Sequence, residues 1–117
     1  MLLSHDETLF SGTDVTASSN SRSNPVITRW SKEAIFFLDI TAVSGTNPTL
    51  DVTIRIYDAG TAKWHLLATF TQKSSVTTDV GYVQYGLGDQ VACDYAIGGT
   101  NTPTFTFKVT ANLKDQT

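Results

Sequence analysis

The feature of this 117-residue chain that most constrains its fold is a strict two-residue alternation of side-chain character. In the segment Thr49–Tyr57, every second residue is a branched aliphatic one: Leu50, Val52, Ile54 and Ile56. The residues between them are mainly polar or charged. Successive side chains of a β-strand point to opposite faces of the sheet. The segment therefore predicts a strand with one buried face and one exposed face.

Further strands are expected at the segments Ile35–Thr41, Lys63–Thr71, Gln90–Ile97 and Thr104–Ala111, with a shorter one at Tyr82–Tyr85. No part of the sequence sustains the period of an amphipathic helix, and parallel strands would need helical crossovers. We therefore expect an all-β, antiparallel β-sandwich of the jelly-roll or immunoglobulin-like type, with about seven to eight short strands.

The N-terminal part of the chain differs in composition from the rest. Residues 11–25 are rich in Ser and Asn and poor in large apolar side chains. We expect residues 1–25 to form an extended N-terminal arm and residues 26–117 to form the sandwich domain.

Charge and cysteine content exclude several classes of function. The net charge is −3 and the basic residues are scattered, so no nucleic-acid partner is expected. The single cysteine, Cys93, can form no internal disulfide, which fits synthesis in a reducing cytoplasm. We see no signal peptide and no apolar run long enough to cross a bilayer, so no membrane partner is expected.

No residue pattern predicts catalysis, and the chain is not expected to be an enzyme. His5 and His65 lack the spacing of metal ligands, and no nucleotide-binding motif is present, so no metal and no cofactor is expected. Asp39 and Asp51 lie on expected strands joined by the 42–48 loop, so they could be cross-strand neighbours, as a glycosidase's two carboxyl groups would have to face each other. Both alternate away from the apolar face, which favours a role in solubility.

Two loops resemble one another. Residues 42–50 and 96–105 both carry Gly, then Thr-Asn, then Pro: Asn47 and Pro48 in the first, Asn101 and Pro103 in the second. Common turn chemistry explains this, since Gly permits a positive φ and Pro suits the start of a strand. A shared location at one end of the sandwich, forming one contact surface, and an ancestral duplication are the alternatives.

Four further residues are candidates for contact with another protein. Ile35 and Phe37 point away from the apolar face of their strand, which suggests a second covered face. The cover could be the N-terminal arm, a second subunit or a partner, and a strand buried on both sides fits equally well. Arg29 and Trp30 lie near the arm, where the indole ring could be half exposed.

One stretch resembles a known class of protein. Residues 41–52 read Thr-Ala-Val-Ser-Gly-Thr-Asn-Pro-Thr-Leu-Asp-Val, and Trp64 and Thr69-Phe70 follow. With the closing Gly98-Gly99-Thr100 and Pro103-Thr104-Phe105, this resembles small virion proteins of tailed bacteriophages over roughly residues 34–110. The usual Asp-Gly turn before the Trp is replaced here by Asp58-Ala59-Gly60-Thr61.

The resemblance implies a head-decoration (cement) or minor capsid protein and carries no catalytic residues. We therefore expect a protein of the capsid surface of a virion that binds the major capsid protein, stabilises the shell, and forms a dimer or trimer. The alternative is a carbohydrate- or host-surface-binding module of a tail or head fibre. That function would need an exposed aromatic platform of Trp30 and tyrosines.

Overall fold

The fold is that of a computed structural model, which describes residues 2–85 and 87–116. The described residues form strands and no helix, and every pair of strands is antiparallel. The strands are β1 (Leu2–Val15), β2 (Ser19–Asn20), β3 (Val26–Ile27), β4 (Glu33–Asp58), β5 (Lys63–Thr69), β6 (Thr77–Tyr85) and β7 (Gln90–Gln116). The expected all-β, antiparallel class is confirmed.

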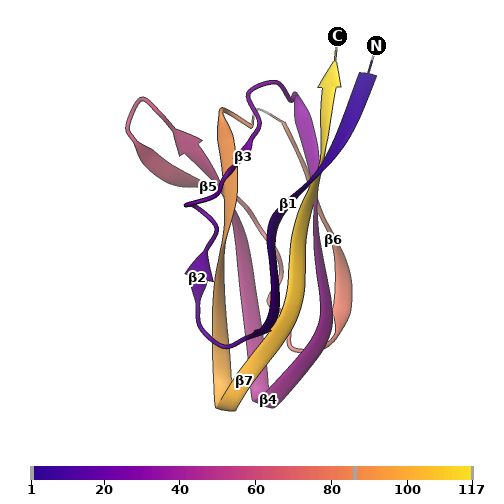
Figure 1. Ribbon diagram of the computed structural model, residues 1–117, viewed down its shortest axis with the longest axis vertical. Coiled ribbons are helices and arrows are strands. Elements are labelled where there is room, and N and C mark those ends of the chain that lie inside the picture. The colour runs from indigo at the N-terminus through magenta and orange to yellow at the C-terminus, as the bar shows by residue number, and fades with distance from the viewer. Residues whose placement is uncertain (1, 86, 117) are drawn as a thin grey trace.

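Strands β4 and β7 are far longer than the short strands expected. They contain 26 and 27 residues, and they pair with one another along both of their halves. Residues 35–41 and 49–57, expected as two strands, are the two halves of β4. Both strands bend sharply at the same level, where Thr46 pairs with Thr100 (Figure 1). The sheet therefore folds over on itself without interruption of its pairing.

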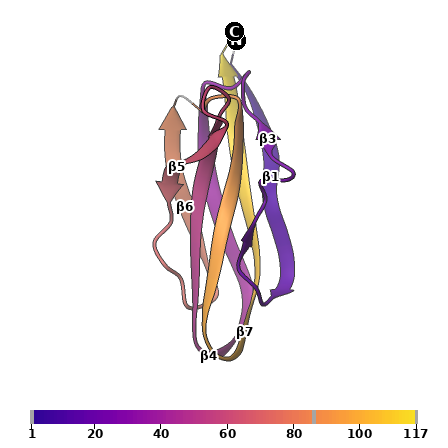
Figure 2. The same ribbon diagram turned by 90° about the vertical axis from the view of Figure 1, so that its left-hand side faces the viewer.

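The bends divide the molecule into two layers. One layer has the order β1, residues 104–116 of β7, residues 33–44 of β4, and β6. The other has the order β2 with β3, residues 90–98 of β7, residues 49–58 of β4, and β5. Figure 2 shows the folded molecule edge on. These eight segments have the strand order of a jelly roll, one of the two sandwich types expected.

The core lies between the inner faces of the two layers. In β4 and in residues 104–111 of β7, the alternating residues predicted to face inward are buried, except at two segment ends, where Ala42 is exposed and Ile56 is half-buried. The largest fully buried side chains include Phe36, Leu38, Ile40, Leu50, Val52, Ile54, Phe105 and Phe107. Their burial follows from the two-residue period of the sequence. Apolar burial of this kind supplies the main favourable free energy of folding.

Strand β5 departs from the predicted pattern. Trp64 and Leu66 were expected to share the inward face of Ala68 and Phe70. Ala68 and Phe70 are buried, whereas Leu66 is 57% exposed. A bulge explains the change, because Ile54 pairs with Ala68 while Arg55 pairs with Leu66, which leaves Leu67 as an extra residue. Because of the bulge, the residues of β5 before Leu67 point to the opposite face from the one predicted, so Trp64 and Leu66 lie on the outer face.

The N-terminal segment is extended as expected, but it is part of the sheet rather than a separate arm. Strand β1 pairs with β7 from Leu2 to Val15, with a bulge at Leu9, whose side chain is 5% exposed. The hydroxyl of Ser18 accepts a hydrogen bond of 2.9 Å from the amide N–H of Ile97. The polar residues of the N-terminal segment do not prevent it from joining the sheet, because a strand at a sheet edge needs apolar side chains on one face at most.

Candidate functional site

The eight candidate contact residues fall on three separate surfaces of the described structure. Asn47, Pro48, Asn101 and Pro103 lie at the two bends. Ile35 and Phe37 lie on the outer face of one layer. Arg29 and Trp30 lie between β3 and β4, near the start of β1.

The two similar loops lie together at one end of the molecule, which we call the folded end (residues 44–49 and 98–104; Figure 1). The side-chain amide of Asn101 donates a hydrogen bond of 2.6 Å to Oγ1 of Thr46. Asn47 and Asn101 both have positive φ, at 48° and 59°, and both side chains are exposed. The fold therefore shows the shared location of the two loops at one end of the molecule.

Glycines make this close approach possible. Gly45 has φ of +103°, and a Cβ added there would lie 2.6 Å from Cα of Pro103. Gly99 has φ of +121°, and its Cβ would lie 2.8 Å from the carbonyl oxygen of Asn47. Each glycine thus lies against the backbone of the opposite loop. The two loops interlock and hold their exposed asparagines in a fixed arrangement.

The face around Ile35 and Phe37 is the outer surface of a layer. Both side chains are half-buried, and Phe37 pairs across the sheet with Thr110. A shallow depression of about 400 Å³ lies beside Phe37, lined in part by Thr8 and Lys108. Strand β1 belongs to the same layer, so it does not cover this face.

A groove of about 700 Å³ lies between β1 and the segment around β3. Trp30 is 36% exposed there, and its ring meets that of His5 edge to face at 5.9 Å. The imidazole Nε2 of His5 lies 2.6 Å from Oε1 of Glu7. Trp30 was a candidate contact residue, whereas His5 was expected within the extended N-terminal arm. Only the pairing of β1 with β7 reveals that His5 and Trp30 meet.

The alternative function would need tyrosines beside Trp30, and two of them lie elsewhere. Tyr57 packs against Trp64 with the ring centroids 5.2 Å apart. Tyr95 is buried against Phe10, with the centroids 4.5 Å apart. Neither tyrosine contributes to a platform around Trp30. The side chain of Tyr82 lies outside the described residues.

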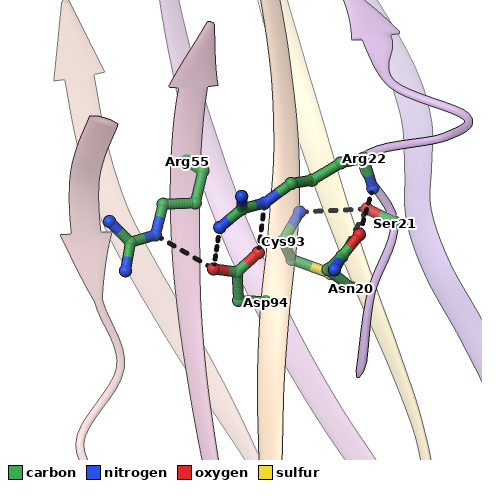
Figure 3. Close-up of polar contacts among 6 residues, drawn as sticks. All are labelled: Asn20, Ser21, Arg22, Arg55, Cys93 and Asp94. Atoms are coloured by element: carbon green, nitrogen blue, oxygen red, sulfur yellow. Dashed lines mark hydrogen bonds and ion pairs between the residues drawn. The ribbon is translucent and has the colours of Figure 1, made fainter. Parts of the chain in front are cut away.

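An ionic cluster around Asp94 ties the chain after β2 to the second layer (Figure 3). The guanidinium of Arg22 donates from Nε and Nη2 to the two carboxylate oxygens of Asp94, at 2.9 and 2.5 Å. Arg55 donates from Nε to the same carboxylate at 3.1 Å. The guanidinium of Arg22 also lies 6.0 Å from the ring centroid of Trp64. A bidentate arginine–carboxylate pair fixes the relative orientation of its two side chains and also stabilises the contact. The cluster therefore holds the chain after β2, which carries Arg22, against β7, which carries Asp94.

Cys93, beside this cluster, is a structural residue (Figure 3). Its amide N–H donates to Oγ of Ser21 at 3.0 Å, and the amide N–H of Ser21 donates to the carbonyl oxygen of Cys93 at 2.9 Å. The side chain is fully buried, and this burial raises the pKa of the thiol from 9.0 to about 11. A protonated, inaccessible thiol is a poor nucleophile.

We expect Cys93 to react with a thiol reagent at pH 8 at least about 100-fold more slowly in the folded protein than in denaturant, because only the exposed thiolate attacks. The raised pKa also has a consequence for stability. The thiol ionises at lower pH in the unfolded chain than in the folded protein. Its contribution to the free energy of unfolding is therefore complete below about pH 8 and is lost as the pH rises toward 11. Absorbance of the released thiol anion measures the rate. Rapid labelling of the native protein would contradict the burial.

The carboxylates considered for catalysis do not meet as neighbours. Asp39 pairs across the sheet with Lys108, whereas Asp51 pairs with Ala96 in the other layer and accepts hydrogen bonds from Gln72. The 42–48 loop is a bend in one strand and not a hairpin, which explains the difference. No group of three or more His, Cys, Asp or Glu side chains that could hold a metal is found within residues 2–85 and 87–116. No helix among these residues is long and apolar enough to span a membrane.

No protein-family model matches the chain, and no curated protein matches it in sequence. Its fold, however, is similar to those of solved structures. The SPBc2 prophage-derived protein YomS aligns over 98% of this chain and 96% of its own, with a TM-score of 0.52 and 11% identity. The VP2 protein of infectious bursal disease virus, in a subviral particle, aligns over 98% of this chain with a TM-score of 0.52 and 13% identity. This chain spans only 33% of that VP2 chain. At such identities the similarity establishes a shared fold.

Proposed function

We propose that this protein is a structural component of a phage virion, and specifically a head-decoration protein that binds the major capsid protein. The observation that carries the proposal is the extent of the match to a prophage-derived protein, which covers nearly the whole of both chains. The same fold forms part of a viral capsid protein. The sequence resemblance to small phage virion proteins supports the same class.

The folded end is the surface we assign to the capsid contact. Its two loops interlock through Gly45 and Gly99, and it presents the exposed side chains of Asn47 and Asn101 together. A surface that is rigid before binding loses little conformational entropy when a partner docks. Uncharged amides suit hydrogen bonding to a protein surface, and they allow binding with little dependence on salt.

Co-sedimentation with undecorated capsids tests this assignment. We expect the protein to bind saturably, and we expect the double variant Asn47→Gly, Asn101→Gly to bind at least about tenfold more weakly, as for the loss of hydrogen-bonding contacts at an interface centre. Glycine keeps the positive φ at both positions. Because Asn101→Gly also removes the hydrogen bond to Oγ1 of Thr46, the thermal unfolding of the double variant is measured beside its binding, to show that the loops keep their structure. The matched control is Ser74→Gly, Ser75→Gly, at two exposed positions between β5 and β6.

Two results would contradict the proposal. Folded protein that does not sediment with capsids at micromolar concentration would remove the decoration function. A double variant that binds as tightly as the control would remove the folded end as the contact surface.

The proposal includes self-association as a dimer or trimer, with the Ile35 and Phe37 face as the contact between copies. A half-buried aromatic ring on the outer face of a sheet gains stability when a second surface covers it. Sedimentation velocity should show an oligomer for the native chain and a monomer for Phe37→Glu. A monomer at every concentration of the native chain would contradict this part of the proposal.

A further inference from the structure

The groove beside β1 lies at the end of the molecule away from the bends. Its walls are residues 4–8 of β1 and residues 24–30, and these segments lie side by side in the two views (Figures 1 and 2). The start of β1 pairs with the end of β7, from Leu2 opposite Gln116, whereas the bends lie at the other end. A ligand in the groove would therefore leave the folded end free.

The chemistry of the groove is mixed. The indole of Trp30 and the side chain of Ile27 are 36% and 43% exposed and supply apolar surface. Glu7, Asn24 and Thr8 supply a carboxylate, an amide and a hydroxyl. These groups can accept and donate hydrogen bonds in several directions. The volume of about 700 Å³ lies within the range of sites for small molecules.

The side chains that line the groove disfavour other classes of ligand. No lysine or arginine is among the described lining residues, and a carboxylate is. An anion such as a phosphate would meet the charge of Glu7 there, and the histidine of the lining, His5, is already paired with that carboxylate. A lipid chain would bury the polar groups of Glu7 and Asn24 without hydrogen-bond partners, which costs free energy.

We propose that this groove binds a neutral saccharide of one or two rings. A sugar ring has an apolar face of C–H groups and a rim of hydroxyl groups. An aromatic ring can contact the first, and neighbouring carboxylate and amide groups can hydrogen-bond to the second. The C–H face packs on the indole of Trp30, and the ring hydroxyls bond with Glu7 and Asn24. The edge-to-face contact of His5 and the 2.6 Å bond between His5 and Glu7 hold both groups in position before binding.

Fluorescence of Trp30 identifies the sugar. The chain has two tryptophans, so Trp64→Phe leaves Trp30 as the only one. This variant is titrated separately with maltose, lactose, α-mannobiose and N,N′-diacetylchitobiose. We expect a saturable change in emission with at least one of them, with half-saturation at roughly millimolar concentration, the range of weak small-ligand sites.

Saturation-transfer NMR then tests the residues in the native background. For the sugar that binds, Trp30→Ala should weaken binding at least about tenfold, and the isosteric Glu7→Gln should weaken it by about threefold to tenfold, which is the loss of one charge-assisted hydrogen bond. Tyr85→Ala removes a ring that is 71% exposed on β6, outside the groove, and should change nothing.

The proposal is overturned if none of the four sugars gives a saturable response in folded protein. It is equally overturned if a sugar binds as tightly to Trp30→Ala and Glu7→Gln as to the native chain. Capsid co-sedimentation of Trp30→Ala, which this proposal expects to be unchanged, separates its failure from failure of the decoration function.

Discussion

Replacement of Leu9 by alanine should lower the free energy of unfolding by about 2–4 kcal/mol. Leu9 is 5% exposed at the bulge of β1, and it belongs to the same core as Phe107. Truncation of a buried leucine removes its transfer free energy and leaves a cavity. Denaturation by urea, followed by circular dichroism, measures the change.

Ser11→Ala is the matched control for this experiment. Ser11 is exposed on the same strand, and its replacement should cost less than about 0.5 kcal/mol. If Leu9→Ala were as mild as Ser11→Ala, β1 would be a detachable arm, and the pairing described for it would be wrong. Because β1 contributes to the core, deletion of residues 1–25 should destabilise the whole domain rather than only remove a contact segment.

The second large effect is expected from Gly45→Ala, which should destabilise the protein by about 2–5 kcal/mol. The left-handed backbone at φ of +103° costs an L-residue roughly 1–2 kcal/mol. The added methyl group would also lie 2.6 Å from the backbone of Pro103, so one loop must move, at a further cost of about 1–3 kcal/mol. Thermal unfolding and urea denaturation both report the loss.

Gly60→Ala provides the comparison, since it makes the same chemical change in another turn. Gly60 lies outside the left-handed region, and the nearest atom to its added Cβ is a side-chain oxygen of Asp58 at 3.3 Å. We expect a loss of less than about 1 kcal/mol there. Equal losses for the two variants would show that the loops of the folded end do not interlock.

The faces of the strands could be predicted from the sequence because a two-residue period is a local property. The inward positions of Phe36, Leu50 and Phe105 follow from it directly. The position of Trp64 could not be predicted in this way. One extra residue at Leu67 changes the face of everything before it in β5, and nothing in the local sequence marks the bulge.

The connections between segments were harder to predict than the segments themselves. A Gly and Pro loop serves equally well as a hairpin or as a bend within one strand, so residues 42–48 gave no indication of which layer follows. The role of β1 depends on residues about a hundred positions away in β7, and the Ser- and Asn-rich stretch that begins within it, residues 11–25, has the composition of an exposed loop.

For the candidate sites, the sequence partly predicted which side chains are exposed. It did not predict which of them lie next to one another. Trp30 and the pair of asparagines were recognised individually. His5 and Glu7 became part of the groove only through the pairing of β1 with the last strand. The proximity of His5 and Trp30 can be recognised only once the strand topology is known, because no spacing along the chain brings residues 5 and 30 together.

The position of β7 has a consequence for how the protein is made. Residues 104–116 lie in the interior of their layer, between β1 and β4, and they supply Phe105 and Phe107 to the core. During translation, the first strand emerges from the ribosome long before the segment with which it pairs. The domain therefore has to complete its folding after these residues have been released, and contacts between such distant segments form slowly. Until then, β1 lacks the strand with which it pairs, and an unpaired strand edge is prone to aggregation.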